Sequence, residues 1–223
     1  TGMGLNFGSN TLFYQNNQRF LTSSTTAAGN LSIGYQSPTG LDANGGLYNT
    51  AVGYQAMQNA TSTDYNTALG YQALKGSATI SSTGYNTAVG YRALYSNTTG
   101  TNNTANGYNS LFSNTTGARN IANGSNSLNS NTTGGYNTAV GGYGSLMYNT
   151  TGDGNSAYGD TSLFSNTTGA KNTANGLSSL FNNTTGTGNI GLGYSSGYGD
   201  GTIVDQRSVI DNYMTFIGYQ ASR

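Results

Sequence analysis

The chain has 223 residues, of which only 6% are charged, and its formal net charge is zero. A typical soluble domain is about 25% charged, so the composition excludes an ordinary globular surface and offers no basic patch for nucleic acid. Histidine, cysteine, tryptophan and glutamate are all absent, which removes disulfides, thiolate metal sites and most acid–base catalysts. The chain is rich instead in Gly (35), Asn (31) and Tyr (18).

Residues 1–29 carry only a vestige of the pattern that follows, at Gly8, and they contain several aromatic side chains, among them Phe13, Tyr14 and Phe20. We predict that this segment is an N-terminal cap or irregular lead-in that hides the open edge of the first repeat. The chain opens on Gly-rich sequence without an initiator Met, and we interpret it as a fragment of a longer protein.

From residue 30 to 193 one motif recurs, Asn-Thr-Ala-x-Gly-Tyr-x-Ala/Ser-Leu. Its glycine falls, mostly at intervals of 17 residues, at Gly53, Gly70, Gly90, Gly107, Gly124, Gly141, Gly159, Gly176 and Gly193. Weaker copies place it at Gly8, Gly34 and Gly218, and the interval of 18 between Gly141 and Gly159 comes from the extra glycine in Gly141-Gly142. Such self-similarity is typical of a repeat architecture, here of about twelve units.

The unit at 103–119 shows what each position predicts. Thr104 is β-branched and suits a strand, and a site that repeatedly holds alanine, as at Ala105, is too tight for more. Gly107 predicts a sharp bend with positive φ, and Leu111 is an apolar anchor. The unit ends in Asn-Thr-Thr-Gly, a turn signal with Gly117 in the left-handed region. We therefore predict short strand, bend, short strand and turn.

Seventeen residues with so few apolar side chains cannot bury a core alone. Stacking solves this problem, because each rung covers the next with main-chain hydrogen bonds and aligned side chains. Identical Asn and Thr residues in register form ladders that satisfy their own polar groups. The glycine density disfavours helices, so the predicted fold is all-β, a repetitive β-solenoid.

Two later segments break the repeat. Residues 75–83 lengthen one turn. Residues 194–223 combine an irregular insertion with a final rung at 216–219 and lead toward a further C-terminal region. The insertion holds Asp200, Asp205, Arg207 and Asp211. We interpret it either as a receptor-contacting loop or clasp between chains, or as a cap or linker at the end of the shaft.

The Asn-Thr-Ala-Val-Gly-Tyr units at 49–54, 86–91 and 137–143 resemble the head repeats of YadA-like trimeric autotransporter adhesins. Similar longer repeats with Asn-Thr-Thr-Gly turns occur in bacteriophage tail fibres. The resemblance implies a left-handed parallel β-roll and an intertwined or side-by-side homotrimer. The 17-residue period departs from the shorter adhesin repeat, so the turn of each rung is enlarged.

In such a trimer, the fourth column of the motif acquires a meaning. Asn106, Asn123 and Asn175 stand where other units carry Val or Leu, and three symmetry-related Asn side chains would form polar layers on the axis. The alternative is a half-buried column that tolerates either residue type. The tyrosine column, with Tyr54, Tyr71, Tyr91, Tyr108 and Tyr194, is either a packing ladder or a surface on which sugars stack.

The sequence thus favours a structural shaft or head of an extracellular, cell-surface or virion-borne fibre that contributes to host-cell or surface attachment. Its expected partners are its own copies and a surface glycan or protein receptor. We expect no catalytic residues, metal or cofactor, no nucleic acid, and no membrane insertion by this segment. A monomeric ice-binding solenoid is the alternative, and a polysaccharide depolymerase using Asp200, Asp205 and Asp211 is a third hypothesis.

Overall fold

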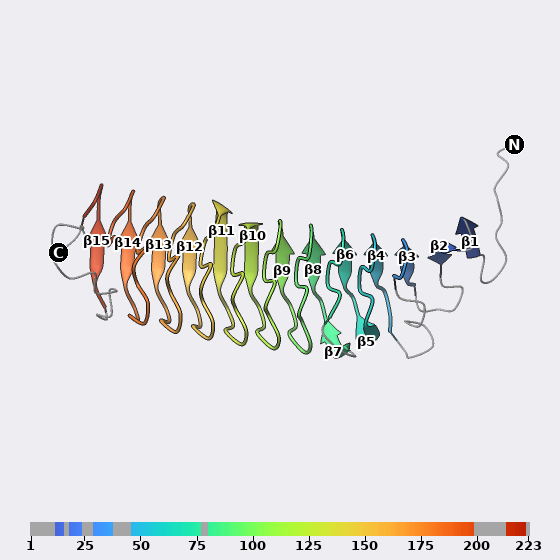
Figure 1. The fold of residues 1–223 in the computed structure, drawn as a ribbon. Coiled ribbons are helices and arrows are strands. Elements are labelled where there is room, and N and C mark those ends of the chain that lie inside the picture. Colours follow the sequence, from blue (N-terminus) through green and yellow to red (C-terminus); the bar gives the residue numbers. More distant parts are fainter. Residues whose placement is uncertain are drawn as a thin grey trace, which may run out of the picture.

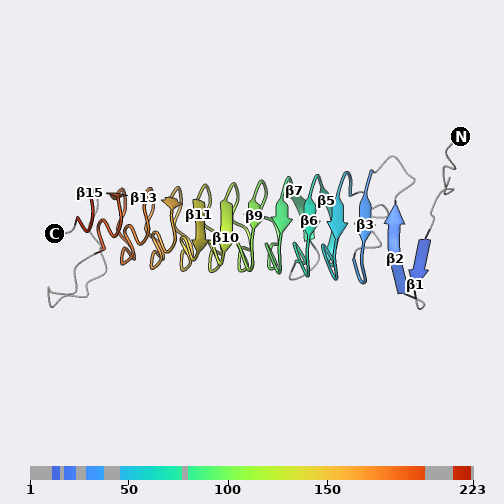
Figure 2. The same cartoon turned by 90° about the horizontal axis from the view of Figure 1, so that it is seen from above.

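The chain forms an all-β rod (Figure 1) in a computed structural model that describes residues 12–15, 18–23, 29–37, 46–76, 80–198 and 213–221. Each turn of the chain adds one short strand to a single long sheet, and the view from above shows the turns in one row (Figure 2). None of the residues in these ranges belongs to a helix. The all-β solenoid predicted from the repeat is confirmed, and its rungs stack in parallel, as the resemblance implied.

The long sheet consists of thirteen strands in chain order. They are β1 (Leu12–Gln15), β2 (Gln18–Ser23), β3 (Leu31–Ile33), β4 (Thr50–Val52), β6 (Thr67–Leu69), β8 (Thr87–Val89), β9 (Thr104–Asn106), β10 (Ile121–Ser125), β11 (Thr138–Tyr143), β12 (Ser156–Tyr158), β13 (Thr173–Asn175), β14 (Ile190–Leu192) and β15 (Thr215–Ile217). Two further strands, β5 (Ala60–Asp64) and β7 (Ile80–Gly84), pair in parallel in a small separate sheet. That pair includes part of the lengthened turn at 75–83.

The eleven strands from β3 to β15 run parallel with equivalent motif positions side by side. Ala105, for example, lies opposite Ala88 in β8 and Ala122 in β10. At a strand spacing of about 4.8 Å, this part of the rod is about 50 Å long. At its N-terminal edge, β2 pairs antiparallel with β3, and β1 pairs antiparallel with β2.

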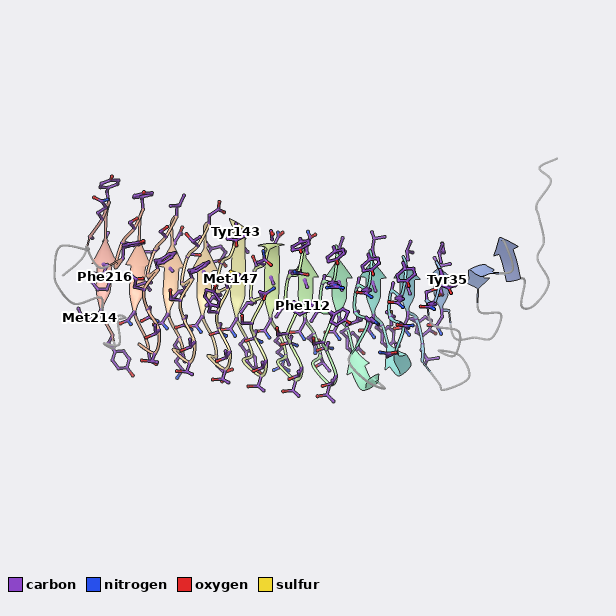
Figure 3. The ribbon with its side chains drawn as sticks, viewed as in Figure 1. Tyr35, Phe112, Tyr143, Met147, Met214 and Phe216 are labelled. Atoms are coloured by element: carbon purple, nitrogen blue, oxygen red, sulfur yellow. The ribbon has the colours of Figure 1, made fainter. Side chains whose placement is uncertain are left out.

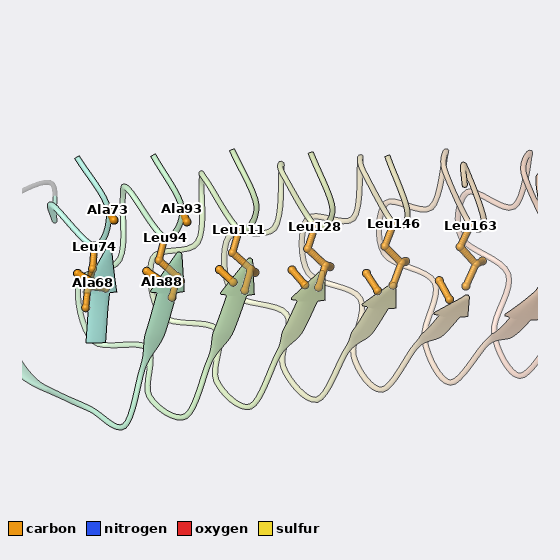
Figure 4. Close-up of a cluster of buried hydrophobic side chains, with 14 of the residues drawn as sticks. Ala68, Ala73, Leu74, Ala88, Ala93, Leu94, Leu111, Leu128, Leu146 and Leu163 are labelled. Atoms are coloured by element: carbon orange, nitrogen blue, oxygen red, sulfur yellow. The ribbon is translucent and has the colours of Figure 1, made fainter. Parts of the chain in front are cut away.

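The core is narrow and consists mainly of two columns of apolar side chains, with a second alanine (Ala56, Ala73 and Ala93) in the rungs of β4, β6 and β8 (Figure 4). The motif alanines are completely buried, as are the anchors that follow them: Met57, Leu74, Leu94, Leu111, Leu128, Leu146, Leu163 and Leu180. Each regular rung therefore adds one large apolar side chain to the core. The expectation that the alanine site lies in a crowded interior is confirmed, because both columns pack into one continuous cluster.

The prediction of a second strand in each unit is wrong for most rungs. In the rung of β9, Asn109 and Leu111 have φ values of 52° and 50°, which are left-handed and not extended. Asn109 N donates to Tyr91 O in the preceding rung (2.9 Å), whereas Leu111 N donates to Ser127 O in the following one (3.0 Å). The chain thus bonds both neighbours without being extended. The left-handed conformation costs roughly 1–2 kcal/mol per residue, which burial of the leucine offsets.

Two buried asparagine ladders run along the core, the first from Asn49 to Asn189 and the second from Asn97 to Asn183. In the first, at the start of the strands, Asn120 N donates to Asn103 Oδ1 (2.9 Å). In the second, at the turn, Asn114 Nδ2 donates to Asn97 Oδ1 (3.0 Å). Gly117 O joins the two ladders, since it accepts from Asn103 Nδ2 (2.8 Å) and Asn114 Nδ2 (3.0 Å). The predicted asparagine ladders are confirmed.

Glycine has two different roles in the rung. Gly107 has a φ of 137°, so the predicted bend with positive φ is confirmed there. Gly117, at the end of Asn-Thr-Thr-Gly, is not left-handed, and that prediction is wrong. A Cβ atom on Gly117 would lie 2.4 Å from Gly134 O and 2.4 Å from Asn114 Oδ1. This glycine is required because the next rung and the asparagine ladder approach it closely.

Candidate functional site

The outward face of the long sheet is a regular surface that extends along the rod. Side chains alternate along each strand, so in β9 Ala105 points inward while Thr104 and Asn106 are exposed. The same alternation repeats from rung to rung and gives two outward columns. We call the column at the position of Thr104 the threonine column and the column at the position of Asn106 the mixed column. We call the surface that they form the strand face. Apolar members of the strand face are well exposed, with Leu69 at 47% and Ile121 at 45%.

Asn106, Asn123 and Asn175, predicted as polar layers on a trimer axis, all lie in the mixed column and are exposed in the single chain. Asn123 in β10 lies directly opposite Asn106 in β9. Asn175 in β13 lies between Tyr158 and Leu192. The structure therefore places all three on one surface, two of them on adjacent rungs.

The predicted tyrosine ladder is present at the edge where the strands end. Tyr54, Tyr71, Tyr91 and Tyr108 stack in sequence, with ring centroids 5.2, 5.1 and 5.2 Å apart and nearly parallel planes. Tyr194 stacks on Tyr219 at 5.2 Å. Figure 3 shows the side chains of successive rungs repeated in rows, with Tyr143 at the upper edge.

This stacking bears on the sugar-binding interpretation of the ladder. Sugars pack against the faces of aromatic rings, but each inner ring of the ladder has a neighbour on both of its faces. Tyr91, for instance, lies between Tyr71 and Tyr108. The inner rings thus present their edges to solvent, which favours the packing interpretation for them.

Further aromatic stacks were not identified from the sequence. Tyr48, Tyr65 and Tyr85 stack at 5.2 and 5.0 Å immediately before the strand-initial asparagines. Another column follows the buried leucines, where Tyr95 stacks on Phe112 (5.1 Å) and Phe164 on Phe181 (4.9 Å). The signal that identified the first ladder, an aromatic residue recurring at the repeat interval, was also present for these.

All three described carboxylates accept hydrogen bonds from main-chain amides of the preceding rung. Asp64 Oδ1 accepts from Leu47 N (2.8 Å), Asp153 Oδ1 accepts from Gly135 N (2.6 Å), and Asp160 Oδ1 accepts from Gly142 N. Within the described residues no cluster of three or more acidic side chains could hold a metal ion. The described acids thus serve as hydrogen-bond acceptors for backbone amides of the rod.

Three of the described cations, Lys75, Arg92 and Arg119, lie over aromatic rings. The Arg92 guanidinium lies 5.1 Å from the centroid of Tyr91, and Arg119 lies 5.1 Å from that of Tyr136. Arg92 Nε also donates to Gln72 Oε1 (2.8 Å), at the end of a row in which Gln72 Nε2 donates to Gln55 Oε1 (2.6 Å). These charges belong to the side-chain columns next to the strand face.

The predicted loop or clasp residues Asp200, Asp205, Arg207 and Asp211 lie outside the described residues. No protein-family model, curated protein or solved structure matches the chain. Across the described ranges there is no helix with the length and apolarity to span a bilayer. The functional proposal below therefore depends on the construction of the rod and on the resemblance of its repeats.

Proposed function

We propose that the chain is a structural shaft or head of an extracellular fibre, of the kind found in bacteriophage tail fibres and bacterial surface adhesins, and that three copies assemble side by side. Such a fibre holds an attachment segment away from the surface that carries it. The segment with Asp200, Asp205, Arg207 and Asp211 is the receptor loop or clasp in this proposal.

The observation that carries the proposal is the continuous bonding along the rod. In the rung of β9, Thr104 N donates to Asn120 O in the next rung (2.8 Å), and Gly107 N donates to Val89 O in the preceding one (2.8 Å). The two asparagine ladders add buried side-chain hydrogen bonds in the same direction. A structure bonded in this way transmits force along one axis, which is the task of a shaft.

Assembly into a trimer is supported by how little each rung buries. One large apolar side chain and one or two alanines per regular rung make a thin core, while apolar side chains such as Leu69 and Ile121 stay exposed. Contact between copies would remove this area from water, with a gain of roughly 25 cal/mol per Å². Closed cyclic symmetry is the usual way in which identical chains cover such a surface.

The test is the molar mass of the chain in solution, measured by light scattering during gel filtration. The expected result is three times the 23.0 kDa of one chain, together with unbranched rods in electron micrographs. A folded species with the mass of one chain would remove the trimer from the proposal.

The ice-binding alternative has one observation in its favour. The threonine column lies on the outward face of the long sheet and contains Thr50, Thr67, Thr87, Thr104, Thr138, Thr173 and Thr215, all exposed or half-exposed. A regular hydroxyl array of this kind can order water. An ice-recrystallisation assay tests it: inhibition by the wild type that Thr104→Lys abolishes would support ice binding, and no inhibition would exclude it.

A further inference from the structure

We infer that the strand face is the surface through which copies of the chain meet, parallel and in register, so that each rung faces the same rung of its partners. This inference rests on the proposed self-assembly and specifies its geometry. The partner is a second and a third copy of this chain.

The distribution of charge identifies the face. From β3 to β15, no outward strand position in the long sheet holds Asp, Lys or Arg. Around a symmetry axis, each side chain near the axis meets its own copies, and like charges there would repel. The rest of the rod is less suitable, because Arg92, Lys75, Arg119 and Lys171 emerge from the turns.

The distribution of apolar side chains identifies the same face. The mixed column begins with Ile33, Val52, Leu69 and Val89 and ends with Leu192 and Ile217. Several members are more than one third exposed in the single chain, including Leu69, Leu192 and Ile217. A long regular row of this kind is typical of an interaction surface.

The order along the mixed column favours the parallel, in-register arrangement. In that arrangement valines and leucines meet valines and leucines, and Asn106, Asn123 and Asn175 each meet their own copies. An amide carries both donors and an acceptor, so three of them at one level can hydrogen-bond in a ring. A shift in register would bury an amide against apolar side chains without a partner, which is costly.

The main chain leaves few alternatives for lateral contact within the described rungs. Backbone groups of each rung bond the rungs before and after it, as with Asn109 N to Tyr91 O and Leu111 N to Ser127 O. Association between rods therefore has to use side chains on a face. Of the faces, the strand face alone combines exposed apolar side chains with an absence of charge.

Disulfide cross-linking tests the inference, and the chain is suited to it because it has no cysteine. Three single variants of the full chain are compared after mild oxidation: Asn106→Cys and Asn123→Cys on the strand face, and Thr116→Cys on an exposed turn. Disulfides form only when Cβ atoms come within about 3.5–4.5 Å. We expect both face variants to give linked dimers, with at most two of every three chains joined, and the turn variant to give none.

The possible outcomes separate the inference from the proposed function. If the wild type has the molar mass of three chains, and Thr116→Cys is cross-linked while neither face variant is, the inference is overturned but the proposed fibre function stands. Cross-linking only in a mixture of Asn106→Cys and Asn123→Cys would indicate an antiparallel or shifted arrangement and would also overturn it. A mass of one chain for the wild type would remove both. Circular dichroism of each variant verifies that the rod has folded.

Discussion

The carboxylate of Asp160 accepts a hydrogen bond from the backbone amide of Gly142, the residue by which the rung of β11 is longer than its neighbours. The same oxygen accepts from Tyr143 N at 3.3 Å. The inserted glycine shifts the register between β10 and β11, so that Ser125 lies opposite Tyr143. Asp160 occupies a position where other rungs carry tyrosine, and it supplies the acceptor that the widened strand needs.

Asp160→Ala is expected to lower the free energy of unfolding by about 1 kcal/mol, because the amides of Gly142 and Tyr143 lose their acceptor and water replaces it only in part. In a chain from which Gly142 has been deleted, the same substitution is expected to have almost no effect. A double-mutant cycle followed by denaturant unfolding measures the difference. Equal costs in both backgrounds would show that Asp160 does not serve the insertion.

Ser127 and Ser162 occupy equivalent buried positions but differ in their hydrogen bonds. Ser127 Oγ is buried without a partner, whereas Ser162 Oγ donates to Gly159 O (2.8 Å) and lies 2.9 Å from Ser145 Oγ. Ser127→Ala is therefore expected to leave the thermal midpoint unchanged or raise it. Ser162→Ala is expected to lower the free energy of unfolding by about 1 kcal/mol, and with it the thermal midpoint. Thermal unfolding of the two variants side by side checks this order, which a lower midpoint for Ser127→Ala would reverse.

Asn131 is a central member of the turn ladder. Its Nδ2 donates to Asn114 Oδ1 (2.8 Å) and Gly134 O (2.9 Å), and its Oδ1 accepts from Asn149 Nδ2 (2.9 Å). Asn131→Ala is expected to cost roughly 2–4 kcal/mol, because it opens a cavity and leaves Asn114 Oδ1 without its donor.

Hydrogen exchange followed by mass spectrometry measures the effect of Asn131→Ala, since in a stacked repeat the damage is local. Protection should fall most in the rungs of β9, β10 and β11. Thr133→Ala, an exposed neighbour in the same turn, serves as the control and should change little. A loss of protection spread evenly along the rod would argue against the ladder as a local clamp.

Gly117 and Gly154 separate the two reasons for glycine in this fold. A Cβ on Gly117 would lie 2.4 Å from the carbonyl oxygen of Gly134, whereas Gly154 has a φ of 67° and only Lys171 Cγ near, at 3.8 Å. Gly117→Ala is expected to cost about 3 kcal/mol through the clash. Gly154→Ala should cost only about 1 kcal/mol through its backbone conformation. Chemical denaturation compares them, and equal costs would contradict the steric explanation.

The repeat by itself determined the architecture. Because equivalent residues recur every 17 positions, stacking places Ala105 beside Ala88 and Ala122 and places Asn120 beside Asn103, so the sheet, the register and the asparagine ladders follow from the period. The alternation at Thr104, Ala105 and Asn106 likewise determines which side chains point outward. The tyrosine ladder follows for the same reason.

Only the tertiary structure decided the backbone conformations and the steric restrictions that arise where neighbouring rungs touch. Leu111 is left-handed because its amide bonds the next rung while its side chain fills the core, and no propensity within one unit predicts that. Gly117 is required because Gly134 and Asn114 leave no room for a Cβ atom, and not because of its φ. A repeated sequence determines which residues become neighbours, but how closely their backbones approach, and hence which conformations they can adopt, is settled only when the rungs are stacked.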